Sequence, residues 1–292
     1  MQQREKDFLD FFFAMEDVFF GLTEMAKSSY CHFDIKSENM VIEPKTMKIK
    51  FIDYGLSRTF NKIHKWPDLN RCYFVWPYEL AFLYQSNLAL ILSISQEMRK
   101  YNPDRARIRQ LHDLIKKSMM FKYNKAYSPE FANEFITGNN PYLDVLSKAV
   151  HEPFNPIIDT ANDFSVMGNH DYLKKYAFIE KLDVYSVGMV LTQAWASIMG
   201  VKFVNDPSIS ILPQAKMAQV KHPLVLNSIR SLISSMIQGY YKERQSAGGA
   251  NNRFLDIKRR MFDKPKEIIS VVKPASIEKV LNKQPSIQSL SN

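Results

Sequence analysis

Polar side chains follow one another at short, fixed intervals near the start of this 292-residue chain. They are His32, Asp34, Lys36 and Asn39, and a further aspartate follows in the triplet Asp53-Tyr54-Gly55. Three of them, Asp34, Asn39 and Asp53, carry oxygen atoms that suit a hard cation such as Mg²⁺. This ion takes few protein ligands and completes its shell with waters and phosphate oxygens. The residue types therefore indicate a magnesium site.

A short β-hairpin must bring these side chains together. The sequence predicts one strand at residues 40–42, a turn at residues 43–46 and a second strand at residues 48–52. A hairpin holds the loop before it and the loop after it side by side. We therefore expect Asp34, Asn39 and Asp53 to converge at one end of the hairpin.

The segment His32-Phe33-Asp34-Ile35-Lys36-Ser37-Glu38-Asn39 resembles the catalytic loop of the eukaryotic-type protein kinases, and Asp53-Tyr54-Gly55 resembles their metal-binding triplet. By this resemblance Asp34 accepts the proton of the substrate hydroxyl, while Asn39 and Asp53 hold Mg²⁺ beside ATP. Lys36 neutralises charge on the transferred phosphoryl group, as in the serine/threonine branch. Val41 lies beneath the adenine. The resemblance gives His32, Tyr54 and Gly55 structural roles.

Three more positions match structural residues of the same family. Glu79, in Trp76-Pro77-Tyr78-Glu79, resembles the glutamate that ends the activation segment. Arg244, in Glu243-Arg244-Gln245-Ser246-Ala247, resembles the arginine that pairs with that glutamate and braces the lobe. Asp183, in Asp183-Val184-Tyr185-Ser186-Val187-Gly188, resembles the residue that hydrogen-bonds the backbone amides of the catalytic loop. A plain helix N-cap is the other interpretation of Asp183, and the two can hold together.

The elements around the hairpin are expected to be helices. Apolar residues recur in steps of three and four over residues 5–27, which predicts one amphipathic helix. Residues 183–198 are apolar on most faces, as a fully enclosed helix must be, and residues 224–237 repeat the amphipathic pattern. We expect a mainly α fold with a short hairpin, the C-terminal lobe of a protein kinase.

The chain departs from the family in two ways: an N-terminal lobe is missing and a long segment is inserted. No Gly-x-Gly-x-x-Gly motif occurs and only about thirty residues precede Asp34, so we expect the N-terminal β lobe, with its nucleotide-binding lysine, to be absent. The interval between Glu79 and Asp183 is much longer than in the family, which predicts a helical insertion at about residues 81–175. The lobe then spans residues 1–250, and residues 251–292 form a basic tail with serines and prolines. The insertion and the scarcity of glycine are similar to divergent kinases of large DNA viruses.

Composition indicates the cellular compartment in which the protein is found. Hydrophobic residues make up 46% of the chain, which is typical of a globular protein, and the two cysteines suit a reducing compartment. The sequence contains no secretory signal and no apolar run long enough to span a membrane. We expect a soluble, cytoplasmic protein, in the host cell if the source is viral. The net charge of +9 favours a solvated basic tail over a nucleic-acid or membrane partner.

Three functions compete at this point. The first is a protein serine/threonine kinase that uses ATP and Mg²⁺ on a protein substrate, with the small lobe supplied by a separate chain or a longer gene product. The second is a pseudokinase-like binding module, which would have no need of the complete set Asp34, Lys36, Asn39 and Asp53. The third is a small-molecule phosphotransferase of kinase-like fold, against which Lys36 and Arg244 argue.

Overall fold

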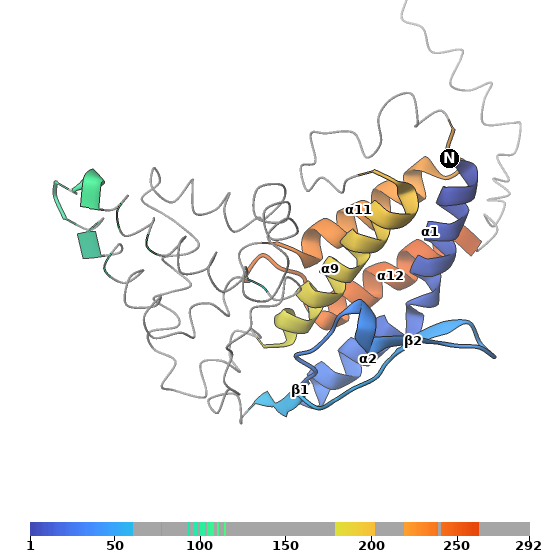
Figure 1. Cartoon of the computed structure of the whole chain (residues 1–292), viewed down its shortest axis with the longest axis horizontal. Helices are drawn as coiled ribbons and strands as arrows, with labels where there is room; N and C mark the ends of the chain where they lie inside the picture. Colours follow the sequence, from blue (N-terminus) through green and yellow to red (C-terminus); the bar gives the residue numbers. More distant parts are fainter. Residues whose placement is uncertain are drawn as a thin grey trace, which may run out of the picture.

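The computed structural model describes four stretches of the chain, residues 1–60, 179–201, 219–238 and 241–262, with isolated positions at 77, 93, 96–97, 100–102, 104–107, 110 and 114. Five long helices in these stretches pack together, and a two-stranded hairpin lies against one of them (Figure 1). Helix α9 passes through the middle of this bundle and contacts α1, α2, α11 and α12. The fold is therefore organised around α9.

The first 27 residues form two helices, α1 (Gln2–Ala14) and α2 (Glu16–Lys27). The prediction of a single helix over residues 5–27 is wrong at Met15, where the backbone turns to φ −75° and ψ 6°. Neither glycine nor proline marks this break, and the apolar period continues through it. Met15 at the break is fully buried, and both helices bury apolar residues on either side of it.

Helix α9 (Glu180–Met199) is buried along most of its length, as the sequence predicts. Twelve of its 20 residues are buried, and the ring of Trp195 contacts Phe8 of α1 at 5.0 Å. The helix ends at Gly200, whose φ of +63° is the left-handed conformation that glycine adopts without strain.

Two further helices close the bundle. Helix α11 (Pro223–Met236) begins with proline at its first turn and buries the apolar face predicted for residues 224–237. Helix α12 (Ala247–Phe262) contacts both α2 and α11. Phe254 of α12 is fully buried and stacks on Phe19 at 4.6 Å. The packed part of the molecule thus continues past residue 250, into the segment that composition alone assigns to the tail.

The strands form two small antiparallel ladders. Strand β1 (Tyr30–Cys31) pairs with β4 (Arg58–Thr59), and β2 (Met40–Glu43) pairs with β3 (Lys48–Phe51). The β2–β3 hairpin confirms the predicted one to within a residue at each end. Lys48 joins it to α2 through ion pairs with Glu16 and Asp17, both at 3.1 Å. These contacts hold the hairpin against α2.

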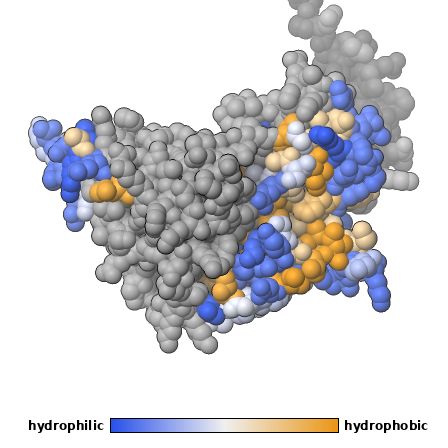
Figure 2. All heavy atoms as spheres, viewed as in Figure 1, coloured by the Kyte–Doolittle hydropathy of each residue, from blue (hydrophilic) through white to orange (hydrophobic). Residues whose placement is uncertain are grey.

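Several predictions fall outside the described residues: the position of Glu79, nearly all of the insertion at 81–175, and the tail from residue 263 onward. Among the helices that are described, none combines the length and the apolar character needed to cross a bilayer. In Figure 2, hydrophobic side chains of the described helices are open on the face in view and are bordered by hydrophilic ones.

Candidate functional site

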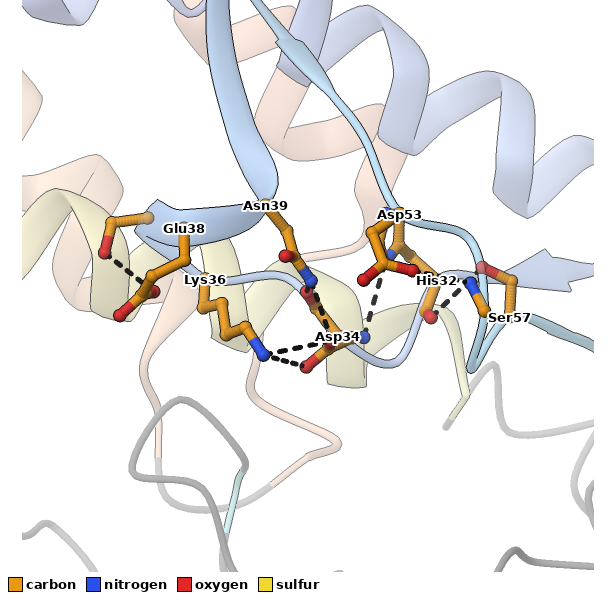
Figure 3. Close-up of polar contacts among 9 residues, drawn as sticks. His32, Asp34, Lys36, Glu38, Asn39, Asp53 and Ser57 are labelled. Carbon is orange, nitrogen blue, oxygen red and sulfur yellow. Dashed lines mark hydrogen bonds and ion pairs between the residues drawn. The ribbon is translucent and has the colours of Figure 1, made fainter. Parts of the chain in front are cut away.

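The carboxylate of Asp34 is held from two sides. Lys36 Nζ donates to both of its oxygens, at 3.0 and 3.1 Å, and Asn39 Nδ2 donates to Oδ2 at 2.7 Å (Figure 3). The same Asn39 amide group donates to the backbone carbonyl of Asp34 at 2.8 Å. The short 3₁₀ helix Ser37–Asn39 makes this closure possible, because it turns the chain back between Lys36 and β2. The loop therefore presents one oriented, mostly buried carboxylate.

The backbone before Asp34 is strained, and α9 holds it. Phe33 has a φ of +64°, which a residue with a bulky side chain rarely adopts. Asp183 of α9 accepts the N–H of His32 at 2.6 Å and the N–H of Phe33 at 3.0 Å, one for each carboxylate oxygen. These are the hydrogen bonds predicted for Asp183. The N-cap interpretation fails, because α9 begins at Glu180 and its N-cap is Ile179.

Burial raises the pKa of the Asp183 carboxyl group, and the hydrogen bonds from His32 and Phe33 act in the opposite direction. The Asp183 carboxylate is 3% exposed, so these two amides replace much of the water that its charged form has lost. Removing either bond would leave the buried charge with less compensation. Asp183 is thus a positioning residue for Asp34.

His32 connects the two halves of the site. Its Nδ1 accepts the N–H of Asp34 at 3.3 Å, and its ring contacts the rings of Phe51 and Tyr54 at 5.3 and 4.7 Å. Ser57 Oγ donates to the His32 carbonyl at 3.2 Å. Nε2 of His32 is buried and has no hydrogen-bond partner in the part of the chain that the structure describes. The imidazole therefore serves as a packed spacer between the loop and the triplet 53–55.

Asp53 comes directly after the hairpin. The N–H of Ile52 donates to the carbonyl of Asn39 at 2.9 Å, which places Asp53 next to the end of β2 where Asn39 lies. Asp53 has a φ of +58°, and its Oδ1 accepts the N–H of Gly55 at 3.1 Å. Figure 3 shows Asp34, Asn39 and Asp53 gathered at this end of the hairpin, as predicted. Strained backbone on both sides of the cluster is typical of functional sites.

The oxygen atoms available at the site fit Mg²⁺. Within the described stretches, Oδ1 of Asn39 and Oδ2 of Asp53 accept no hydrogen bond from the protein. The same stretches contain no cluster of three His, Cys, Asp or Glu side chains that could hold a metal alone. One amide and one carboxylate oxygen suit an ion that takes its other ligands from water and phosphate.

The remaining predicted residues lie at the edges of the site. Val41 and Tyr54 are about half exposed, and burial of the remainder raises the pKa of the Tyr54 hydroxyl. Arg244 is buried, donates to the carbonyls of Gln238 and Lys181, and lies 4.9 Å from the Tyr185 ring. Its predicted pairing with Glu79 lies outside the described residues.

Sequence reasoning missed two contributors to the site. Ser57 ties the segment after Gly55 to the loop, and nothing in its sequence context distinguishes it from any surface serine. The left-handed backbone at Phe33 is equally hidden, because neither glycine nor asparagine marks it.

No protein-family model, curated protein or solved structure matches this chain. The interpretation of the site therefore depends on its own residues and their contacts.

Proposed function

We propose that this chain is the C-terminal catalytic lobe of a protein serine/threonine kinase, which transfers the γ-phosphoryl group of ATP to a protein hydroxyl. One observation carries the proposal: the carboxylate of Asp34 is fixed by Lys36 and Asn39, on a loop clamped by Asp183, at the end of the hairpin that leads to Asp53. A polar turn without chemistry to perform has no use for so many converging contacts.

Each residue has a role that follows from its chemistry. Asp34 accepts the proton of the attacking hydroxyl, and the bonds from Lys36 and Asn39 orient its oxygens for this. Lys36 Nζ, about one-fifth exposed, also provides positive charge near the transferred group. Asn39 and Asp53 would hold Mg²⁺, which when bound neutralises charge on the phosphate oxygens.

An exposed apolar surface supports the idea of a separate small lobe. Four large apolar side chains of the hairpin and its ends are more than one-third exposed: Val41, Ile42, Met47 and Ile52. A two-stranded hairpin is marginally stable alone, and an apolar face of this kind is typical of a covered surface. We infer that a β-rich small lobe, from a separate chain or from a longer gene product, covers the hairpin and closes the site over ATP.

The test compares the chain alone with the chain joined to the small lobe of an established serine/threonine kinase. Catalysis of phosphoryl transfer needs positioning as well as charge, so the chain alone should bind Mg-ATP weakly and transfer phosphate slowly or not at all. The joined protein should phosphorylate a degenerate serine/threonine peptide library, as measured by incorporation of labelled phosphate.

Matched variants decide whether the measured activity belongs to this site. Asp34→Asn and Asp53→Asn should abolish transfer in the joined protein, whereas Asp10→Asn, at an exposed carboxylate of α1, should not change it. Transfer that survives Asp34→Asn would refute the proposed base. Binding of a partner by the joined protein with no transfer under any condition would favour the binding-module alternative.

A further inference from the structure

A groove lies at the end of the bundle opposite to Asp34. Asp183 and Met199 are separated by most of α9, or roughly 24 Å at 1.5 Å per residue, and the Met199 carbonyl accepts a hydrogen bond from Arg4. Two adjoining cavities of about 320 and 380 Å³ open there, between α1, α12 and the start of α11. Both are lined by Lys221 and His222. We call this pair of cavities the α11 groove.

The floor of the α11 groove is apolar. The side chains that line it include Leu9, Phe13, Val225, Ile257 and Met261. Two large apolar residues at its edges face water, with Leu224 79% exposed and Phe262 59% exposed. Exposed leucine and phenylalanine beside an apolar groove are characteristic of a surface that binds another molecule.

The charge that borders the groove is positive. Lys221, His222 and Arg260 line the 380 Å³ cavity, and Arg260 pairs with Asp256 at 2.6 Å, so among the described residues the unpaired positive charge belongs to Lys221. In the 320 Å³ cavity, Asp10 pairs with Lys6, and both oxygens of Glu5 are bonded to backbone amides. Within the described stretches, the side chains of Lys221 and His222 have no hydrogen-bond or ion-pair partner. A ligand with negative charge therefore meets a lysine that is not already neutralised.

The start of α11 offers unused backbone donors to the same space. The carboxylate of Glu5 accepts hydrogen bonds from the N–H groups of Lys221 and His222, both at 2.7 Å. These bonds fix the chain just before the helix. The N-cap residue His222 makes no side-chain cap, and in the described part of the chain nothing accepts from the N–H groups of Leu224 and Val225. Both of these residues line the 380 Å³ cavity. A carboxylate bound there would satisfy two orphan donors and the positive end of the helix dipole.

We propose that the α11 groove binds an acidic peptide segment of a partner protein. A large apolar side chain of the peptide enters the cavity between α11 and α12, and a neighbouring carboxylate caps α11 beside Lys221. The two adjoining cavities suit an extended ligand. One unpaired lysine among the described residues of the rim is too little charge for a nucleic-acid backbone, and a concave apolar floor suits a side chain better than a flat bilayer. The inference is independent of the kinase proposal, because the groove shares no residue with the Asp34 site.

The test measures fluorescence anisotropy of the full chain with short labelled peptides. A peptide of glutamates and leucines should bind, and its versions with lysine for glutamate or alanine for leucine should bind at least about tenfold more weakly. Lys221→Glu and Leu224→Ala should each weaken binding of the acidic peptide by about tenfold. The controls, Lys27→Glu and Phe20→Ala, reverse the charge of one exposed residue of α2 and truncate an exposed apolar one, and should leave binding unchanged.

A spectroscopic measurement covers the case of a variant that fails to fold. In the wild-type chain labelled with ¹⁵N at leucine and valine, the amide resonances of Leu224 and Val225 should move downfield when the acidic peptide is added. The proposal is overturned if no peptide binds, if the lysine peptide binds equally well, or if Lys221→Glu behaves like Lys27→Glu. Displacement of the bound acidic peptide by single-stranded RNA or by anionic vesicles would assign the groove to another class of partner and would also overturn it.

Discussion

Two buried carboxylates in this protein perform the same task in different places. Asp183 accepts the amides of His32 and Phe33, and Glu5 accepts those of Lys221 and His222. A carboxylate can receive two consecutive N–H groups because it has an acceptor on each oxygen, whereas an amide side chain has only one acceptor. Each pair shapes a loop that the local sequence would leave undetermined.

Replacing Asp183 by asparagine tests whether the loop before Asp34 needs a carboxylate that accepts two backbone N–H groups. The new amide group would face one of the two backbone donors, and we expect a loss of about 2 kcal/mol in unfolding free energy. Equilibrium unfolding in guanidinium measures this loss. Thr192→Ala is the control on the same helix, because Thr192 Oγ1 only donates to the carbonyl of Gly188 one turn earlier. Equal stability of the two variants would show that the Asp183 clamp is dispensable.

At the scale of elements, the periods in the sequence predict the helices and the hairpin well. Residues 183–198 and 224–237 are recognisable because burial of a helix leaves a regular apolar pattern. The break at Met15 was not predictable, since it depends on contacts with distant helices and no helix-breaking residue marks it. The convergence of Asp34, Asn39 and Asp53 followed from the hairpin alone. The backbone carbonyls that accept from Arg244 could not be predicted, because backbone carbonyls have no sequence signature.

The packing of α9 against the end of α11 can be tested at Gly188, with Gly248 of α12 as the contrast. A Cβ at Gly188 would lie 2.7 Å from Ile237 Cγ2 and 3.0 Å from Met236 Cβ, so Gly188→Ala should destabilise the fold by about 1 to 3 kcal/mol. A Cβ at Gly248 of α12 would have nothing within 4 Å, so Gly248→Ala should stabilise by up to about 1 kcal/mol. The unfolding midpoints measure both changes. Stabilisation by Gly188→Ala would mean that the two helices are not in close contact.

On the scale of the whole molecule, contacts between distant segments hold the bundle together. Glu5 is bonded to backbone groups 216 and 217 residues away, and Lys258 of α12 pairs with Glu16 of α2. Glu5→Gln removes one acceptor from a side chain that is only 2% exposed and should cost about 2 kcal/mol. Hydrogen exchange at Lys221 and His222 should accelerate with it. Asp7→Asn changes an exposed carboxylate that is hydrogen-bonded to Gln3. It should change the free energy of unfolding by no more than about 0.5 kcal/mol and should leave hydrogen exchange at Lys221 and His222 unchanged.

The hydrogen bonds from Lys221 and His222 to Glu5 can form only late in translation, because these residues lie far apart in the sequence. A ribosome adds about 5 to 20 residues per second, so roughly 10 to 40 s pass between the emergence of Glu5 and that of Lys221. During most of this time the stripe that contains Phe8 and Phe12 lacks Trp195, and throughout it lacks Phe254, which both contact the stripe in the folded protein. A nascent chain with an uncovered aromatic helix for that long exposes the kind of apolar surface that chaperones bind. The yield of folded protein will therefore depend on how fast the chain is translated and on how well such chaperones are supplied.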